Sequence, residues 1–404
     1  MRLFKLSISD YFYYILAFLF FGSVYPGLWD RFIIGNTTVL YQLGFLMIWV
    51  IMALPMINKF RIKKSFCILL LVSFITCALH CLIHQDNPGG LILYVEAFVI
   101  IGLISTKHNQ FMKVLLWFNA IMVVLSVVGV ILAYMGLLSP IGTPLQMPND
   151  DAYVDNYLFF FVKKLNDVAD VLFRSCGYYD EPGSFAYVIM LSLIYNKIHI
   201  GSKQLETIFL YGGLATLSAA HIFTVLLYVF FFNLKNHLQR LSVLLIALGV
   251  FWFASLETDN TILQWIKIAS VDRVEKIITG EDESRNYSGS SKMLQDHLIF
   301  GDSEKELSKY NVSRDTISFY ISKYGLIGSL LIYIPILFII RNNIRKGVFS
   351  DEMKLIYIFM LNCIQRPDFV YPLYLVMIYY TWYSNTSGGT NKSKELIYGK
   401  VSHL

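Results

Sequence analysis

The sequence predicts an all-α, polytopic membrane protein, and three observations carry this prediction. The chain has 404 residues, of which 56% are hydrophobic and only 15% are charged, whereas a soluble domain carries about a quarter charged residues. Apolar runs of about 20 residues recur along the chain, and this length crosses a hydrocarbon core of about 30 Å. Short basic segments separate the runs at alternate positions. This composition excludes an ordinary soluble domain.

The apolar runs predict about twelve transmembrane helices, with a plausible range of 10–12. The run Tyr11–Trp29 is predicted to be a retained first helix, because no small-residue cleavage site follows it. The pair at 206–234 is the most ambiguous, since it fits one long or two short helices. The predicted spans are 11–29, 38–57, 66–83, 91–106, 111–137, 184–198, 206–218, 220–234, 241–256, 316–340, 354–365 and 371–384.

The distribution of lysine and arginine predicts the orientation of these helices. Nineteen basic residues fall in alternate segments, whereas the short segments on the other side contain only Arg31 and Arg366. Because cytoplasmic loops are enriched in lysine and arginine, both termini are predicted to be cytoplasmic. Residues 1–384 are then one transmembrane domain, and 385–404 form a polar cytoplasmic tail.

Two long segments, 138–183 and 257–315, are predicted to lie outside the membrane and to contribute the active site. In the first, Tyr157–Leu172 has apolar residues at helical spacing around lysines and aspartates, which is typical of an amphipathic helix at the interface. In the second, Glu257–Thr279 has a helical pattern, and Ser290–Leu298 is predicted to be a further helix after a polar turn.

The stretch Arg174–Ser192 organises the rest of the chain. It reads RSCGYYDEPGSFAYVIMLS, a polar loop that passes through Pro182 directly into an apolar run. Proline suits the first turn of a helix, so the Glu181 carboxylate is expected at the N-terminal mouth of a membrane helix. Charges at the edge of a span are costly and are often functional. The alternative is that the acids only stabilise the helix dipole.

Charged and aromatic residues of the two long segments could form a binding site for a lipid-linked, phosphorylated sugar. Arginine side chains fork onto phosphate oxygens, a carboxylate can accept a proton from a hydroxyl, and tyrosine faces suit sugar rings. For any single residue the alternative is a solvated surface charge. The candidate set is Arg174, Arg273, Arg285, Arg314, Glu181, Asp302, Asp315, Tyr178 and Tyr179.

Several motifs give the chain a resemblance to the bacterial O-antigen polymerase family. The most specific is Arg174-x-x-Gly177-Tyr178-Tyr179-x-Glu181-Pro182-Gly183, which enters a span. The others are Leu217-Ser218, Gly301-Asp302, Tyr324-Gly325-Leu326-Ile327-Gly328 and Arg366-Pro367-Asp368. The resemblance covers the layout from about 120 to 384, with few identities.

The resemblance implies a glycosyltransferase C-like fold. It also implies a metal-independent glycosyltransferase of surface polysaccharide (lipopolysaccharide) biosynthesis in the bacterial inner membrane. Its substrate would be an undecaprenyl-diphosphate-linked glycan, with no cofactor and no nucleic-acid partner. Its other partners would be membrane lipid and a chain-length regulator and flippase of the same pathway. Arg174, with Arg285 or Arg273, would hold the diphosphate; Arg314, Arg366 and the tyrosines would bind substrate. Glu181 would be the general base, with Asp302 and Asp315 next.

Two other functions stay open. O-antigen ligases are similar in layout but are credited with a histidine in the second long segment, where this chain has only His297. A flippase or transporter of polyprenyl-linked sugars would share the many spans, although the internal repeats often seen in transporters are not found. The quartet Cys77, His80, Cys81 and His84 shares one helical face, yet metal binding there is a minor alternative.

Overall fold

The protein is described from a computed structural model. The structure describes residues 16, 20, 38–142, 145–146, 153–157, 160–164, 173–179, 181–234, 236, 239, 287–312, 316–367 and 369–384. This part of the chain is mostly helical and carries one small sheet. The predicted helices 241–256 and 257–279 and nearly all of 11–29 lie outside these residues.

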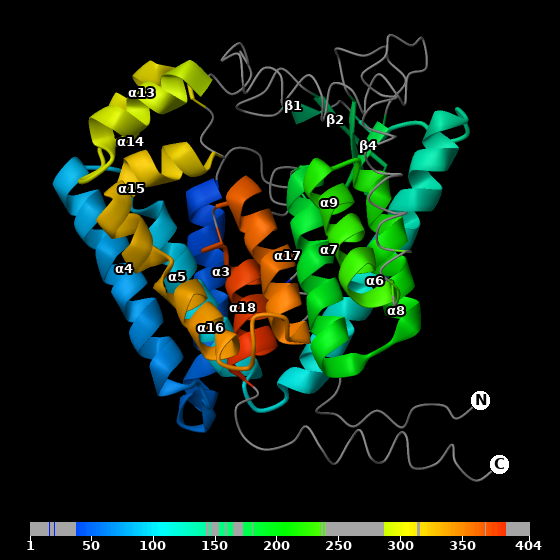
Figure 1. Cartoon of the computed structure of the whole chain (residues 1–404), viewed down its shortest axis with the longest axis horizontal. Coiled ribbons are helices and arrows are strands. Elements are labelled where there is room, and N and C mark those ends of the chain that lie inside the picture. Colours follow the sequence, from blue (N-terminus) through cyan, green and yellow to red (C-terminus); the bar gives the residue numbers. More distant parts are fainter. Residues whose placement is uncertain are drawn as a thin grey trace.

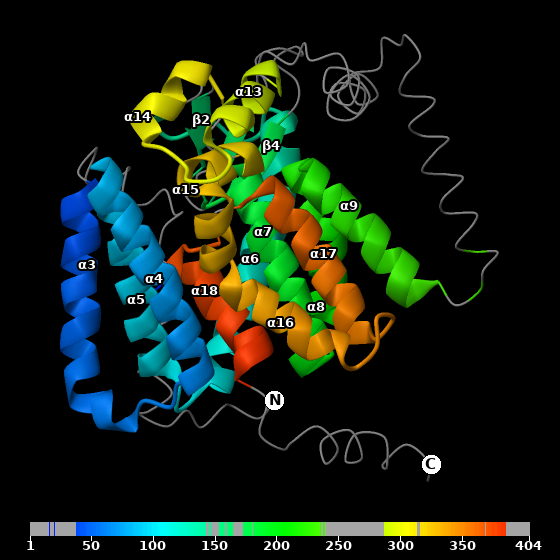
Figure 2. The same cartoon turned by 60° about the vertical axis from the view of Figure 1, so that its left-hand side comes forward.

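Most of the long helices run side by side, and α13 and α14 lie across one end of the body that they form (Figures 1 and 2). The first group is α3 (Thr38–Ala53), α4 (Lys64–His84), α5 (Gly89–Ile104), α6 (His108–Tyr134), α7 (Pro182–Tyr195), α8 (Lys203–Thr207) and α9 (Ala219–Tyr228). The second group is α13 (Tyr287–His297), α14 (Glu304–Leu307), α15 (Ile317–Ile332), α16 (Ile334–Ile344), α17 (Asp351–Gln365) and α18 (Pro372–Ile378). Helix α13 confirms the predicted helix at 290–298.

Short 3₁₀ and π turns interrupt or extend several helices. They are η1 (Leu54–Lys59), η3 (Asn196–Ile200), η4 (Ile208–Gly212), η5 (Gly213–Thr216), η6 (Val229–Asn233), η8 (Ser308–Tyr310) and η9 (Tyr379–Tyr383). The sheet and the pair α13–α14, which belong to the two long segments, lie at the same end of the helical body (Figures 1 and 2). The basic η1–α4 junction lies at the opposite end.

The count of about twelve membrane-spanning helices is not supported by the described residues. Within the described ranges, only α4 and α6 are both long and apolar enough to cross a bilayer, and α15 with α16 would add one more if that pair, bent by 42°, is a single span. The other predicted spans in the described ranges are also helical. Helices α5 and α17 are continuous but short, with 16 and 15 residues, whereas π turns, 3₁₀ turns or the break at Leu217 interrupt most of the others. The chain is therefore a helical protein with at least two apolar helices of membrane-spanning length.

The prediction of an all-α fold holds for most of the described residues but not for the first long segment, where residues form an antiparallel sheet. Its strands follow the order β1 (Leu145–Gln146), β2 (Tyr153–Asn156), β3 (Phe161–Lys164) and β4 (Phe173–Gly177). Strand β3 replaces part of the amphipathic helix predicted at 157–172. Aromatic and β-branched residues around Phe161 and Val162 favour a strand once β4 is available as a partner. The sheet packs on α6, where Gly129 leaves room for the Phe160 ring.

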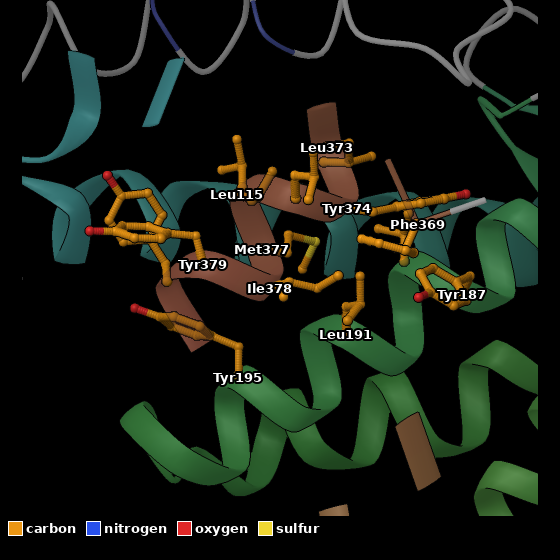
Figure 3. Close-up of a cluster of buried hydrophobic side chains, with 14 of the residues drawn as sticks. Leu115, Tyr187, Leu191, Tyr195, Phe369, Leu373, Tyr374, Met377, Ile378 and Tyr379 are labelled. Carbon is orange, nitrogen blue, oxygen red and sulfur yellow. The ribbon is translucent and has the colours of Figure 1, made fainter. Parts of the chain in front are cut away.

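The core fixes α7, the helix that follows Glu181. Figure 3 shows α18 side chains, including Tyr374 and Met377, packed against Tyr187 and Leu191 of α7. The rings of Tyr187 and Tyr374 lie 4.5 Å apart, and nearly every residue of α7 is buried. Close packing of this kind restricts side-chain movement. The N-terminus of α7 is thus held on a rigid support.

Candidate functional site

The turn from β4 into α7 positions Glu181. Gly177 ends β4 with a φ of +58°, a conformation that glycine adopts without strain. A Cβ atom at Gly177 would also lie 2.9 Å from the Phe185 ring. Glu181 has an extended backbone, Pro182 occupies the first turn of α7, and the Glu181 carbonyl accepts the first helical hydrogen bond from Phe185 N at 3.1 Å.

The Glu181 carboxylate forms an ion pair with Arg366, the residue that follows α17. The side chains are 30% and 22% exposed respectively, so the pair is half-buried. Gly183 makes room for this contact, since a Cβ there would approach Arg366 Nη2 to 2.6 Å. Glu181 makes no side-chain hydrogen bond to the first turn of α7. Its carboxylate therefore joins two distant segments, which goes beyond stabilising the helix dipole.

Three cations act on the Glu181 carboxylate. Burial opposes its ionisation, but the charge and hydrogen bond of Arg366, followed by the charges of Lys163 and Arg174, outweigh burial and lower the pKa of Glu181. Lys163 and Arg174 are directly opposite each other on β3 and β4, so they share one face of the sheet. Glu181 is consequently an ionised acceptor at neutral pH.

Arg174 lies above a break in the helical body. Its Nε donates to the carbonyl of Thr216 at 3.3 Å. Thr216 ends η5, and the next residue, Leu217, adopts a φ of +46°, which is costly for a residue with a bulky side chain. Ser218 then begins α9, and its N–H donates to Thr216 Oγ1 at 3.2 Å. The Leu217-Ser218 motif is thus a helix break, and the residue before it, Thr216, supplies the hydrogen-bond acceptor for Arg174.

Tyr178 and Tyr179 do not offer sugar-stacking faces, so that expectation is wrong. The two side chains are 4% and 0% exposed. Tyr178 packs edge-on against Phe118 of α6 at 5.8 Å. Tyr179 donates to Asn119 Oδ1 at 3.3 Å, and Asn119 Nδ2 donates to Ser192 Oγ at 3.0 Å. These tyrosines pack the β4–α7 turn against the core, because burial of their rings among apolar side chains of α6 and α7 is more favourable than exposure to solvent.

Asp302 lies in a different cluster from Glu181. Its Oδ1 is 3.7 Å from His84 Nδ1 of α4, and its Oδ2 is 3.2 Å from His297 Nδ1 of α13. Figure 1 places α4, α13 and α14 on one flank, with β4 and α7 on the other. The expectation that both long segments bring these charged residues together is therefore wrong for Asp302.

Backbone contacts hold Asp302 against α15. Gly301 and Gly325 both have positive φ angles, and a Cβ on either one would lie under 3.0 Å from the backbone of the other segment. Asp302 N also donates to the carbonyl of Ser322 at 3.0 Å. Gly301-Asp302 and Tyr324-Gly325, motifs about 20 residues apart in the printed sequence, therefore meet as one crossing.

Other predicted site residues fall outside the description or have other roles. Arg273, Arg285, Arg314 and Asp315 lie outside the described residues. Lys163 was missed by the sequence reasoning, since it becomes a neighbour of Arg174 only when β3 pairs with β4. The signal that could have found it is the β-favouring run of aromatic residues before it.

The histidine and cysteine quartet of α4 is not a metal site. His80 pairs with Asp86 at 3.1 Å, His84 faces Asp302, Cys77 contacts Tyr94, and Cys81 contacts the Asn87 carbonyl. Among the described ranges no group of histidine, cysteine or acidic residues has a geometry that could hold a metal ion.

Comparison with known proteins adds no assignment to this geometry. No family model, no curated protein and no solved structure matches the chain.

Proposed function

We propose that the protein is a membrane glycosyltransferase that polymerises undecaprenyl-diphosphate-linked repeat units of a surface polysaccharide. In this proposal the protein lies in the bacterial inner membrane, and the sheet, α13 and α14 face the periplasm. The observation that carries the proposal is the convergence of Arg366, Lys163 and Arg174 on Glu181 where the sheet meets α7. Cations around one carboxylate, beside apolar helices, suit a lipid-linked diphosphate next to a hydroxyl acceptor.

The cations would bind the leaving diphosphate. Arginine guanidinium groups form paired hydrogen bonds with phosphate oxygens, and charge that develops on the leaving group is stabilised by donors already in place. The N-terminus of α7 adds a favourable dipole at the same position. Arg174 is oriented by the Thr216 carbonyl, so its guanidinium needs little reorganisation to receive an anion.

Glu181 would accept the proton of the acceptor hydroxyl. The hydroxyl oxygen of the terminal sugar forms a bond to the anomeric carbon of the donor glycan. The bond from that carbon to the diphosphate oxygen breaks, and the undecaprenyl diphosphate leaves with the electron pair. Glu181 is half-buried and ionised, which are the properties of a general base in such a step. Asp302 and Asp315 are the next candidates for the base.

The test is polymer formation by purified protein on lipid-linked repeat units. We expect Glu181→Gln to reduce the rate by roughly 10²–10⁴-fold, as for loss of a general base. Asp302→Asn should leave the rate within a few-fold of wild type, because its partners are His84 and His297. Near-normal polymerisation by Glu181→Gln, together with loss in Asp302→Asn, would refute this assignment of the base.

A second candidate function is ligation of the finished glycan to a lipid core, and the Asp302–His297 contact favours it. His297 Nδ1 lies 3.2 Å from Asp302, while His297 Nε2 is 3.1 Å from the Tyr310 hydroxyl. A carboxylate that orients an imidazole is a known arrangement for proton transfer. If the protein is a ligase, His297→Ala should abolish transfer to the lipid core and leave polymer on undecaprenyl diphosphate.

A further inference from the structure

An exposed apolar turn joins α13 to α14. Its residues, Leu298, Ile299 and Phe300, are here named the 298–300 tip. All three side chains are exposed, and Phe300 is 83% exposed. Adjacent exposed side chains of this size indicate a surface that meets an apolar environment.

The 298–300 tip is held in place by the glycine crossing with α15. Leu326 N donates to the Leu298 carbonyl at 2.6 Å. A Cβ atom at Gly325 would lie 2.3 Å from the Ile299 carbonyl oxygen. The backbone of the tip is thus packed directly on α15. Its exposure is a fixed property of the fold.

The tip continues the apolar surface of the neighbouring helices α4 and α15. At the end of α4, Leu82 is 76% exposed and Ile83 is also exposed, and the next residue, His84, faces Asp302. On the other side, Leu326 and Ile327 of α15 are exposed. Helix α4 is one of the two helices that are long and apolar enough to cross a bilayer. The tip therefore lies where the outer surface of α4 reaches its end.

Charged residues of α14 and η8 follow the tip in the chain. Lys305 of α14 and Lys309 of η8 are exposed, and Glu306 is partly exposed. An apolar turn followed by charged residues matches the boundary between hydrocarbon and headgroups, where aromatic side chains gather.

A second apolar turn lies at the other end of the same helices. Val348 and Phe349 are exposed between α16 and α17, and Phe349 is 86% exposed. From Leu326 to Ile344 the helix axis rises about 28 Å at 1.5 Å per residue. The 42° bend between α15 and α16 shortens this distance slightly. The two turns are thus separated by nearly the thickness of a hydrocarbon core, about 30 Å.

We propose that the 298–300 tip inserts into the hydrocarbon edge of the bilayer and anchors the α13–α14 cap to lipid acyl chains. The occupant is the bilayer because the tip extends the exposed surface of α4 and lies one membrane thickness from Phe349. Asp302 follows the tip by two residues, so insertion also fixes the height of the cluster formed by Asp302, His84 and His297. This anchor is independent of the glycan chemistry proposed above.

The test uses tryptophan fluorescence in nanodiscs that contain one protomer and phosphatidylcholine brominated on its acyl chains. Phe300→Trp adds one emitter to the six tryptophans of the chain, and the emission of the parent is subtracted. We expect brominated lipid to quench the added emission and aqueous iodide to leave it unchanged. The matched control is Lys309→Trp, whose added emission should be quenched by iodide and unaffected by brominated lipid.

The parent protein provides an internal reference for membrane insertion. Trp117 is exposed on α6, the other helix of membrane-spanning length, so brominated lipid should quench the parent as well. If the parent is quenched but Phe300→Trp is quenched only by iodide, the anchor is refuted while the membrane placement stands. Resistance of Phe300→Trp to both quenchers would mean protein covers the tip, which also refutes the proposal. A single protomer per disc excludes a second copy as that cover.

Discussion

The ion pair of Glu181 and Arg366 gives a prediction that the structure quantifies. We expect the free energies of unfolding of Glu181→Gln and Arg366→Gln to be strongly non-additive. Each single variant leaves one charge without its main partner, whereas the double variant Glu181→Gln/Arg366→Gln removes both charges. A double-mutant cycle isolates the energy of this contact.

The expected coupling is about 1–3 kcal/mol. Two unit charges 4 Å apart attract by about 1 kcal/mol in bulk water and about 4 kcal/mol near a protein surface of lower effective dielectric constant. Exposures of 30% and 22% place the pair between these limits. Desolvation of both groups removes part of the Coulomb gain. A fully exposed pair would give only about 0–1 kcal/mol.

The assay is unfolding by sodium dodecyl sulfate in mixed micelles at neutral pH, with the same cycle on Lys354 and Asp351 as control. That pair joins residues three positions apart at the start of α17, and Asp351 is exposed, so its coupling should stay below about 0.5 kcal/mol. Gly183→Ala should lower the Glu181–Arg366 coupling, because its Cβ would displace the guanidinium. Equal coupling in the two cycles would refute the reasoning.

Three further predictions follow from the same contacts. Arg174→Ala should abolish polymer formation, and Arg174→Lys should retain little activity, since an ammonium group cannot form paired hydrogen bonds with a diphosphate. Gel electrophoresis of the polysaccharide product, with Lys309→Ala as the control, measures this. Polymer of wild-type chain length from Arg174→Lys would contradict the prediction. The pKa of Glu181 in the folded protein is lowered from 4.5, so the stability difference between wild type and Glu181→Gln should be constant above about pH 5. The difference should vanish as the pH falls through the pKa of Glu181 in the folded protein, as measured by unfolding across pH. A difference that persists in strong acid would contradict this prediction. Gly325→Ala should destabilise the protein by several kcal/mol more than Gly347→Ala in the same unfolding assay, because both glycines have positive φ but only Gly325 lies against backbone. At Gly347 the cost is only backbone strain of about 1–2 kcal/mol. Equal losses of stability in the two variants would argue against the crossing.

The sequence predicted which ranges are helical better than it predicted which helices are long and continuous enough to span a membrane. The positions of α4 and α6 follow from long apolar runs, which dominate hydropathy. The π turns of η3, η4 and η6 and the break at Leu217 depend on tertiary contacts, such as that of His221 with the Leu210 carbonyl at 3.1 Å. A window of hydropathy cannot detect these features. The sheet was missed for a related reason, because strand pairing between β3 and β4 is a long-range interaction.

The candidate site was partly accessible from the sequence. The proline after Glu181 and the apolar run after it predicted a carboxylate at the start of a helix, and the structure has it there. The sequence could not indicate that Arg366, far along the chain, would be its partner, because that contact depends on how α17 packs beside α7. For the same reason the sequence could not indicate that Asp302 and Glu181 lie apart. Both are acidic residues of the long segments, and their residue type gives no information on which flank of the helical body each occupies.

The Glu181–Arg366 pair explains how a carboxylate with a lowered pKa could still serve as a base. In the free site Arg366 stabilises the ionised form, so Glu181 holds a proton weakly. A bound diphosphate carries more negative charge than the carboxylate and competes for the same guanidinium, which binds phosphate oxygens through paired donors. As Arg366 turns toward the diphosphate, Glu181 loses its main stabilising charge, and its proton affinity rises. Gly183, with no side chain beside Arg366, leaves the guanidinium room for this movement. Under the proposed function, substrate binding would therefore strengthen the base only when a leaving group is present.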